Sequence, residues 1–192
     1  MGSCEAELHS VIEAIIRRGY RAVFDVGAAE GYYLAGLAHR MPETDFYGFD
    51  TDPLARRQQK RLLVLNGLGN VEIGSYCTSA WLQANANPDS LLICDIEGYE
   101  LSLLNPRQVP ALKHLDVLVE LHPFAPLEYA QVKHTIVDRL DGTHRITCIG
   151  AHQRDQAFYQ TLTNRLFSND QMKTALDEAR LPGQEWLWMQ PK

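Results

Sequence analysis

The sequence lacks paired cysteines, long apolar runs and an excess of basic residues. Its four cysteines, Cys4, Cys77, Cys94 and Cys148, are widely scattered with no Cys-x-x-Cys pair, which excludes a zinc knuckle. Cys94 and Cys148 lie in apolar runs, so we expect buried thiols there. No run approaches the roughly 20 apolar residues of a membrane span, and no apolar signal segment begins the sequence. We therefore expect a cytoplasmic protein without membrane contacts.

Basic residues are outnumbered: 18 lysines and arginines stand against 24 acidic residues, which gives a net charge of −6. The densest basic stretch runs from Arg56 to Arg61 on a predicted helix, where we expect a solvated surface rather than a phosphate-binding patch. A nucleic-acid partner is therefore disfavoured. With 192 residues and 45% hydrophobic content, the chain suits one globular domain that needs no metal or disulfide for stability.

Predicted helices and strands alternate along residues 1–192, without repeats or linkers, and indicate a single domain. A capping helix is predicted within residues 1–20 and a helical insertion at 151–182. Alternation of this kind predicts an α/β fold with a doubly wound, mostly parallel sheet and helices on both faces. In the last strand we expect Trp186 and Trp188 to face the core or the interface of a homodimer. The strands are predicted at 22–26, 46–49, 70–73, 91–94, 115–121, 145–149 and 185–189.

Residues 23–31 join a short apolar run to a turn bounded by Gly27 and Gly31, and a helix follows from about Tyr32. Glycines lack a Cβ and allow the backbone to approach a ligand closely. Two acids, Asp25 and Glu30, stand beside the glycines, which disfavours a pyrophosphate and favours a cationic or neutral ligand. A nicotinamide cofactor would need a fuller Gly-x-Gly-x-x-Gly turn. The segment therefore predicts the nucleotide-binding corner of an α/β fold.

Acidic residues stand at the ends of several predicted strands. Asp50 ends the second strand, at the spacing of a carboxylate that binds ribose hydroxyls. Asp95 and Glu120 end the fourth and fifth strands in the same way. Ligands on doubly wound sheets bind beyond the carboxyl ends of the strands, so we expect one site that includes these acids.

These elements resemble the class I methyltransferases that use S-adenosylmethionine, and most closely the FkbM-type group. The resemblance is carried by residues 25–31, 47–50, 95–100 and 119–122, and the element Asp95-Ile-Glu-Gly-Tyr-Glu100 is its most specific part. It implies a three-layer Rossmann-like methyltransferase fold with a seven-stranded sheet of order 3-2-1-4-5-7-6 whose last strand is antiparallel. It also implies S-adenosylmethionine as the cofactor.

The sequence departs from the pattern of that group at three positions. Ala29 stands where Asn is frequent, Ile93 where Lys is frequent, and Asp50 rather than Glu ends the second strand. We expect cofactor binding to survive these changes. The loss of the Lys bears on the chemistry of the methyl acceptor.

The resemblance also implies a set of cofactor-binding residues. The two glycines would make room for the methionine part, and backbone groups beside them would hold its amino-acid end. Asp25 would either reach the cofactor's amino group through water or accept N–H groups of its own turn. Asp50 would accept hydrogen bonds from both ribose hydroxyls, and the residues after the third strand would border the adenine. The predicted cofactor-binding residues are Asp25, Gly27, Ala28, Glu30, Gly31, Asp50, Ser75, Tyr76, Cys77 and Asp95.

Methyl transfer from a sulfonium is an in-line displacement, so the protein must align the reactants and remove the acceptor's proton. Residues i and i+2 of an extended segment point to the same side, so Asp95 and Glu97 are predicted to converge with Glu120 and His122. His122, neutral at its ordinary pKa of about 6.5, is the predicted base, oriented by Glu120 or Glu97. The same four groups could instead bind magnesium, which is not favoured. Glu100 is predicted to cap the next helix.

The expected acceptor is a hydroxyl on a small molecule such as a natural product, sugar or polyketide. The sequence has neither the Asn-Pro-Pro-Tyr-like element used on planar amines nor the Pro-Cys nucleophile used on pyrimidine carbons. The alternative is a scaffold protein that binds adenosylmethionine with weak or no turnover, because Ile93 replaces the Lys. Aromatic residues could form an acceptor wall or simply pack: Tyr32, Tyr33, Tyr76, Tyr99, Phe124 and Tyr129.

Overall fold

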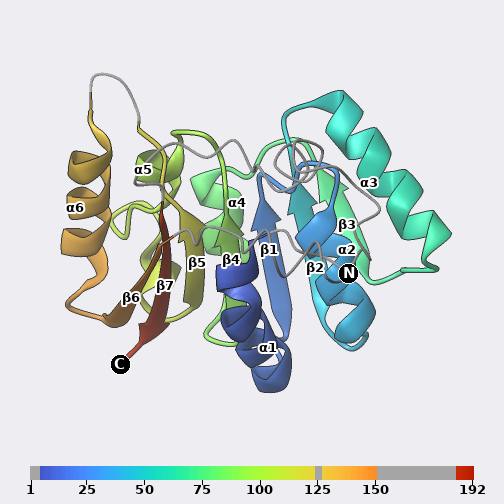
Figure 1. The fold of residues 1–192 in the computed structure, drawn as a ribbon, viewed down its shortest axis with the longest axis horizontal. Coiled ribbons are helices and arrows are strands. Elements are labelled where there is room, and N and C mark those ends of the chain that lie inside the picture. Colours follow the sequence, from blue (N-terminus) through green and yellow to red (C-terminus); the bar gives the residue numbers. More distant parts are fainter. Residues whose placement is uncertain (1–4, 124–126, 151–184) are drawn as a thin grey trace, which may run out of the picture.

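The computed structural model describes residues 5–123, 127–150 and 185–192. Seven strands form one sheet (Figure 1): β1 Ala22–Val26, β2 Asp45–Phe49, β3 Val71–Gly74, β4 Ser90–Cys94, β5 Asp116–Glu120, β6 His144–Gly150 and β7 Glu185–Pro191. The helices are α1 His9–Arg18, α2 Tyr32–Arg40, α3 Pro53–Leu65, α4 Ser79–Asn85, α5 Glu100–Leu103 and α6 Tyr129–Leu140, with short 3-10 turns η1 Ala6–Leu8 and η2 Pro110–Lys113. Most of these elements begin and end within two residues of the predicted positions.

The sheet has the strand order β3-β2-β1-β4-β5-β7-β6, which confirms the predicted topology. Strands β3, β2, β1, β4 and β5 are mutually parallel, whereas β7 runs antiparallel to both β5 and β6. In Figure 1, α6 lies beyond one edge of the sheet and α3 beyond the other. Because these five strands are parallel, their carboxyl ends lie on the same side of the sheet, where a ligand site is expected.

Two hydrophobic layers cover the two faces of the sheet. Alternate residues of β1 belong to different layers. Phe24 belongs to the layer formed with α4, α5 and α6, and Val23 belongs to the layer formed with α1 and α2. Strand β4 is buried along its whole length, as a parallel strand covered on both faces should be. Trp186 and Trp188 belong to the layer under α1 and α2, so of the two predicted environments they occupy the core.

Helix α3 shows how local sequence sets the fold beside the site. The Asp52 side chain accepts a hydrogen bond of 2.8 Å from the Leu54 N–H, and Pro53 occupies the first helical turn. This arrangement is the predicted N-cap followed by proline. It fixes where the chain turns out of β2, directly after Asp50.

Two sequence expectations concern the burial of the cysteines and the predicted helices at 1–20 and 151–182. Cys94 is buried as predicted, but Cys148 is exposed, because it lies on the edge strand β6, which is largely open to solvent. The predicted helical insertion at 151–182 lies outside the described residues, and the N-terminal capping helix is present as α1. Among the described helices, none is long and apolar enough to cross a membrane.

Candidate functional site

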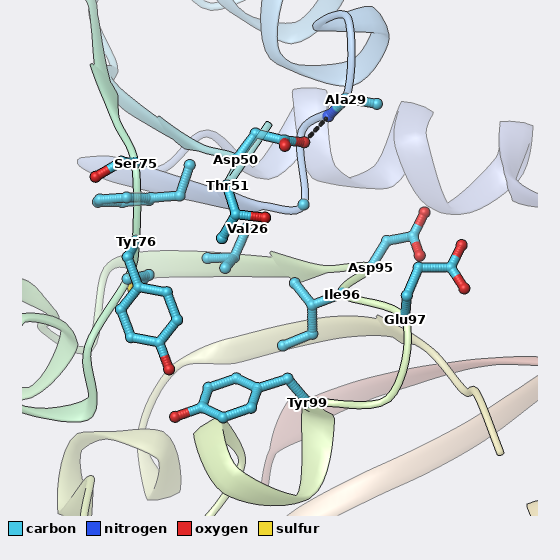
Figure 2. Close-up of a pocket in the computed structure, with 13 residues that line it drawn as sticks. Val26, Ala29, Asp50, Thr51, Ser75, Tyr76, Asp95, Ile96, Glu97 and Tyr99 are labelled. Carbon is cyan, nitrogen blue, oxygen red and sulfur yellow. Dashed lines mark hydrogen bonds between the residues drawn. The ribbon is translucent and has the colours of Figure 1, made fainter. Parts of the chain in front are cut away.

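A cavity of about 290 Å³ opens at the carboxyl ends of the parallel strands (Figure 2). Asp50 and Ala29 lie at one end of it, and Tyr76 and Tyr99 lie at the other. The loops after β1, β2, β3 and β4 all contribute to its wall, so segments far apart in the sequence meet here. The lining residues are Val26, Gly27, Ala29, Phe49, Asp50, Thr51, Ser75, Tyr76, Cys77, Asp95, Ile96, Glu97 and Tyr99.

The glycine turn is anchored to the neighbouring strands. The N–H groups of Gly27 and Ala28 both donate to the Phe49 carbonyl, at 2.8 and 3.0 Å. Gly27 has a φ of +86°, and a Cβ on it would lie 1.6 Å from the carbonyl oxygen of Asp95. Glycine is therefore required because β1 and β4 end so close together. It also borders the cavity, as predicted.

Three of the predicted residues of this turn do not line the cavity. Gly31 has a φ of +97° and packs against Gln59 of α3, where a Cβ would lie 3.3 Å from the Gln59 Cγ. Gly31 therefore packs against α3, and its predicted role beside the cofactor stays a prediction. Ala28 is buried and its N–H is already bonded to Phe49, so that N–H cannot hold a ligand. Glu30 is exposed and outside the cavity lining, which includes Ala29 instead.

Asp50 is held in a fixed position at the cavity. Its Oδ2 accepts from the Ala29 N–H at 2.9 Å and its Oδ1 from the Asp52 N–H at 2.8 Å. The Arg56 guanidinium donates to the carbonyls of Asp50 and Thr51, at 2.7 and 2.9 Å. A carboxylate with four lone-pair sites retains acceptor capacity after two such bonds. The structure therefore presents Asp50 as an oriented acceptor at the predicted place.

Two side chains of α3 that the sequence analysis missed support this loop. Gln59 is fully buried, and its Nε2 donates to the Ala29 carbonyl at 2.7 Å. Arg56, expected to be solvated, is half-buried against the β2–α3 connection, whereas Arg57 and Arg61 are exposed as expected. Arg56 and Gln59 differ from the exposed residues of α3 only because they lie on its buried face. The composition of the helix does not indicate which face is buried.

Asp25 lies beneath the turn rather than in the cavity. Its side chain is 4% exposed, and its Oδ2 has no hydrogen-bond partner among the described residues. Burial, and then the negative charge of Asp95, raise the pKa of Asp25 to about 7, against a hydrogen bond from the Leu34 backbone that lowers it. Asp25 does not line the cavity, and the backbone hydrogen bond that it accepts comes from Leu34 in α2 and not from the turn, so its two predicted roles stay predictions.

The residues predicted to border the adenine, Ser75, Tyr76 and Cys77, all line the cavity. Tyr76 faces Tyr99, with ring centroids 5.7 Å apart and planes tilted by 54°. A hydrogen bond with the Tyr99 side chain and, to a smaller extent, burial raise the pKa of Tyr76 to about 12. Of the six aromatic residues considered for an acceptor wall, only these two reach the described part of the cavity.

The other aromatic residues lie elsewhere. Tyr32 and Tyr33 pack edge-on with ring centroids 5.2 Å apart and line a separate hollow between α1 and α2. Tyr129 is half-buried and packs against the core. Phe124 is outside the described residues. Among the six candidates, the tyrosines that line the described cavity therefore come from the β3–α4 and β4–α5 loops.

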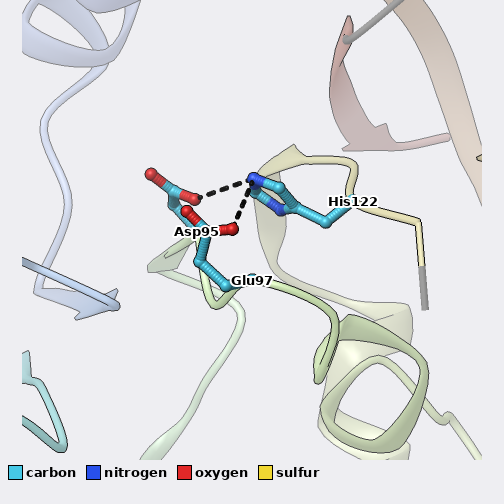
Figure 3. Close-up of side chains that lie close together, drawn as sticks. All are labelled: Asp95, Glu97 and His122. Carbon is cyan, nitrogen blue, oxygen red and sulfur yellow. Dashed lines mark ion pairs between the residues drawn. The ribbon is translucent and has the colours of Figure 1, made fainter. Parts of the chain in front are cut away.

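The four predicted catalytic residues meet beside the cavity, and Figure 3 shows Asp95, Glu97 and His122 among them. The Nε2 atom of His122 lies 3.6 Å from Asp95 Oδ1, 3.8 Å from Glu97 Oε2 and 3.8 Å from Glu120 Oε2. Asp95 and Glu97 also line the cavity. The four groups therefore lie together as the sequence predicts, and their catalytic roles stay predictions.

The protonation state predicted for His122 is wrong for the free protein. Burial lowers the pKa of His122, but a hydrogen bond to Glu100 and the charges of Asp95, Glu100 and Glu120 outweigh burial and raise that pKa to about 9. The imidazole is thus an imidazolium at neutral pH, not a neutral base. Its orienting partner is Glu100, whose Oε1 lies 2.8 Å from His122 Nδ1, rather than Glu120 or Glu97.

Asp95 and Glu97 converge for a different reason from the one predicted. Strand β4 ends at Cys94, and Glu97 has a left-handed φ of +54°, so the segment is a turn and not an extended strand. A non-glycine residue rarely adopts such a φ unless the surrounding structure fixes it. The turn brings the exposed Glu97 carboxylate towards His122, where an extended chain would have continued past it.

The same cluster presents oxygen and nitrogen atoms that a metal ion could coordinate. One ligand atom from each of Asp95, Glu97 and His122 lies within 4.8 Å of the others, and Asp95 Oδ1 is buried without a hydrogen-bond partner among the described residues. Carboxylate oxygens suit a hard divalent cation. The imidazolium would have to lose a proton before its nitrogen could be a ligand. The geometry thus admits the magnesium alternative without favouring it.

No protein-family model and no curated protein sequence matches the chain. Its fold is similar to solved methyltransferase structures. An rRNA methylase from Streptococcus thermophilus is 11% identical with a TM-score of 0.60, and the match covers 100% of this chain and 99% of that one. Precorrin-6y C5,15-methyltransferase from Geobacter metallireducens GS-15 is 12% identical with a TM-score of 0.60, covering 97% and 88%.

The O-methyltransferase TomG from Streptomyces achromogenes, in complex with S-adenosylmethionine, is 15% identical with a TM-score of 0.59, and the match covers 79% of this chain and 74% of that one. Identities this low show the fold alone. The chain therefore has a Rossmann-like methyltransferase fold.

Proposed function

We propose that the protein is an S-adenosylmethionine-dependent methyltransferase that methylates a hydroxyl group on a small molecule. The observation that carries the proposal is Asp50, a carboxylate fixed by two backbone N–H groups at the end of β2, inside a cavity that also includes Gly27 and Asp95. A carboxylate in this place is the ribose-binding group of nucleotide cofactors on such sheets. The FkbM-type subgroup is part of the proposal, supported by the meeting of Asp95 and His122 from its two most specific segments.

The charges of the site suit this cofactor. Asp50, Asp95 and Glu97 surround the cavity, while the sulfonium and ammonium groups of adenosylmethionine are positive. In the proposed pose the ribose lies at Asp50, the adenine lies towards Tyr76 and Tyr99, and the methionine part lies between the glycine turn and Asp95. The buried Asp25 adds negative charge beneath the turn when it is ionised.

The same charges support a small, uncharged acceptor. Carboxylates around the expected methyl position repel phosphate groups, and the chain carries a net charge of −6. A hydroxyl must lose its proton as the methyl group arrives, and the carboxylates beside the cavity supply groups that can accept it. These features favour hydroxyl methylation over a nucleic-acid substrate.

Calorimetry with S-adenosylmethionine and S-adenosylhomocysteine tests the cofactor. Two hydrogen bonds to a charged acceptor are worth about 1.5 to 3 kcal/mol each, so Asp50→Ala should weaken binding by at least about 100-fold. Asp45→Ala is the matched control, because Asp45 is an exposed acid at the opposite end of the same strand. Loss of affinity in both variants, or in neither, would contradict the proposed ribose contact.

Turnover is tested separately, by methyl transfer to a panel of hydroxylated small molecules with magnesium or with a chelator. We expect transfer that does not require added magnesium. Cofactor binding with no transfer to any acceptor would support the scaffold alternative, and activity abolished by the chelator would support the metal alternative. Absence of affinity for both adenosyl compounds would refute the proposed function as a whole.

A further inference from the structure

Glu100 is an acidic residue in the interior with no role in the function proposed above. Its side chain is fully buried, at the first residue of α5. Its Oε1 contacts His122 Nδ1 at 2.8 Å and accepts from the Gly98 N–H at 3.2 Å, while its Oε2 has no partner among the described residues. Glu100 lies in the first turn of α5 as predicted, but α5 has no side-chain cap hydrogen bond, and the side chain of Glu100 contacts His122 and Gly98 instead.

A buried carboxylate is costly unless a positive group compensates it. His122 is the basic residue that forms an ion pair with Glu100 in the described part of the chain. An imidazolium donates from both nitrogens, so the bond to Glu100 aims the Nε2–H of His122 outwards. The charged groups that face this N–H are Asp95 and Glu97 from the β4–α5 turn and Glu120 from the end of β5, all 3.6 to 3.8 Å away.

We propose that Glu100 is a positioning residue that keeps His122 as a hydrogen-bond donor at the centre of this cluster, and that Asp95 accepts the proton of the methyl acceptor. Asp95 is the candidate because it both lines the cavity and faces His122, and because its Oδ1 is buried without a hydrogen-bond partner among the described residues. The inference rests on the proposed function and deepens it.

The proposed step is balanced within the site. The hydroxyl oxygen of the acceptor forms a bond to the methyl carbon with its own lone pair. The carbon–sulfur bond breaks and its electron pair stays on sulfur, giving neutral S-adenosylhomocysteine sulfur. The proton leaves the oxygen for the Asp95 carboxylate, while His122 keeps its own proton. Burial raises the pKa of Asp95, which makes it a better acceptor than an exposed carboxylate, although the positive His122 and a hydrogen bond with Glu120 limit the rise.

Nuclear magnetic resonance titration of the imidazole groups tests the Glu100–His122 pair without cofactor or acceptor. The signal of His122 among the seven histidines is assigned by its loss in His122→Gln. In the wild type we expect His122 to titrate with a pKa of about 9, and in Glu100→Gln at least one unit lower. Asp116→Asn is the matched control, because Asp116 is an equally buried acid that pairs with Arg18 at the other end of β5. An unchanged midpoint in Glu100→Gln would overturn the proposal.

A second measurement covers the case in which Glu100→Gln does not fold. The pKa of His122 is about 9 in the folded protein and about 6.5 when unfolded, so the stability that its protonation contributes is complete below pH 6.5 and is lost as the pH rises to about 9. Between these pH values the wild type should therefore lose stability to urea relative to His122→Gln. Parallel curves for the two proteins would overturn the pairing.

The pH dependence of turnover separates the two possible bases. If Asp95 accepts the proton, kcat stays high from neutral pH and falls above about pH 9, where His122 loses its proton. A kcat that rises through pH 9 would make neutral His122 the base and overturn the proposal. In Glu100→Gln, kcat should fall at least tenfold with unchanged affinity for S-adenosylhomocysteine. The expected titration in a protein that binds no adenosyl compound would support the pair and refute the proposed function.

Discussion

Gly27→Ala is the substitution to which the structure gives the largest steric consequence. The added Cβ would lie 1.6 Å from the Asp95 carbonyl oxygen and 2.5 Å from its carbonyl carbon. Both are backbone atoms, so no side-chain rotation relieves the clash. The turn is also bonded to Phe49 through its N–H, so it cannot move away without losing that bond. The ends of β1 and β4 would have to separate.

Two separate terms contribute to the cost of Gly27→Ala. A φ of +86° strains an L-residue by about 1 to 3 kcal/mol. Forcing a methyl group into a filled space costs about another 1 to 3 kcal/mol. Domains of this kind unfold with about 5 to 15 kcal/mol, so the variant should lose a large part of its stability. Because the moved atoms border the cavity, its affinity for S-adenosylhomocysteine should also fall.

Urea unfolding of the wild type and two variants measures the effect. Gly36→Ala is the control, since Gly36 lies within α2 with no atom near the added Cβ, and it should stabilise the protein by about 0.5 to 1 kcal/mol. Gly27→Ala should have a midpoint at clearly lower urea. A midpoint equal to that of the wild type would refute the claim that the two strand ends touch at this glycine.

Two further predictions concern the support of the site. Gln59→Ala removes the buried amide that holds the Ala29 carbonyl, so it should cost about 1 to 3 kcal/mol in urea unfolding and weaken S-adenosylhomocysteine binding, whereas the exposed Gln58→Ala should do neither. Asp25→Asn should change the pH dependence of stability. Burial and the nearby Asp95 raise the pKa of Asp25 to about 7 from 3.8, so the folded state binds its proton more tightly and wild-type stability falls between about pH 4 and 7, by roughly 4 kcal/mol. Between pH 4.5 and 8 the wild type should lose about 3 kcal/mol more stability than Asp25→Asn, and equal losses in the two proteins would contradict the prediction.

The fold was predictable because its signals are local. Asp52-Pro53 starts α3, the apolar run 91–94 forms most of β4, and a glycine turn ends β1, and each signal is local to a few neighbouring residues. The strand order was different. It came from a resemblance to a known family and not from periodicity, because long-range pairing such as that of β5 with β7 leaves no local mark.

The cavity was predictable where a residue stands at a strand end. Asp50, Ser75 and Asp95 follow directly from strands β2, β3 and β4, and all line the cavity. The contact of Gln59 with Ala29 was missed by the sequence analysis. An amide on a charged helix is expected to be solvated unless the neighbouring loop is known to cover it. Gly27 lines the cavity as predicted, Gly31 packs against α3 outside the cavity lining, and both glycines are needed for contacts within the protein.

The charge cluster shows where spacing rules stop being sufficient. The i, i+2 rule predicted that Asp95 and Glu97 converge along an extended strand. In the structure they converge through a turn in which Glu97 has a left-handed backbone conformation. The same turn begins α5 so that Glu100 enters the interior, and no sequence pattern distinguishes an acid that caps a helix from one that is buried beneath it. Once Glu100 is buried, it requires a cation, and His122 meets that requirement at 2.8 Å. A buried residue 22 positions away therefore favours the protonated form of His122, together with Asp95 and Glu120, and in the proposed reaction the proton acceptor is one of the carboxylates.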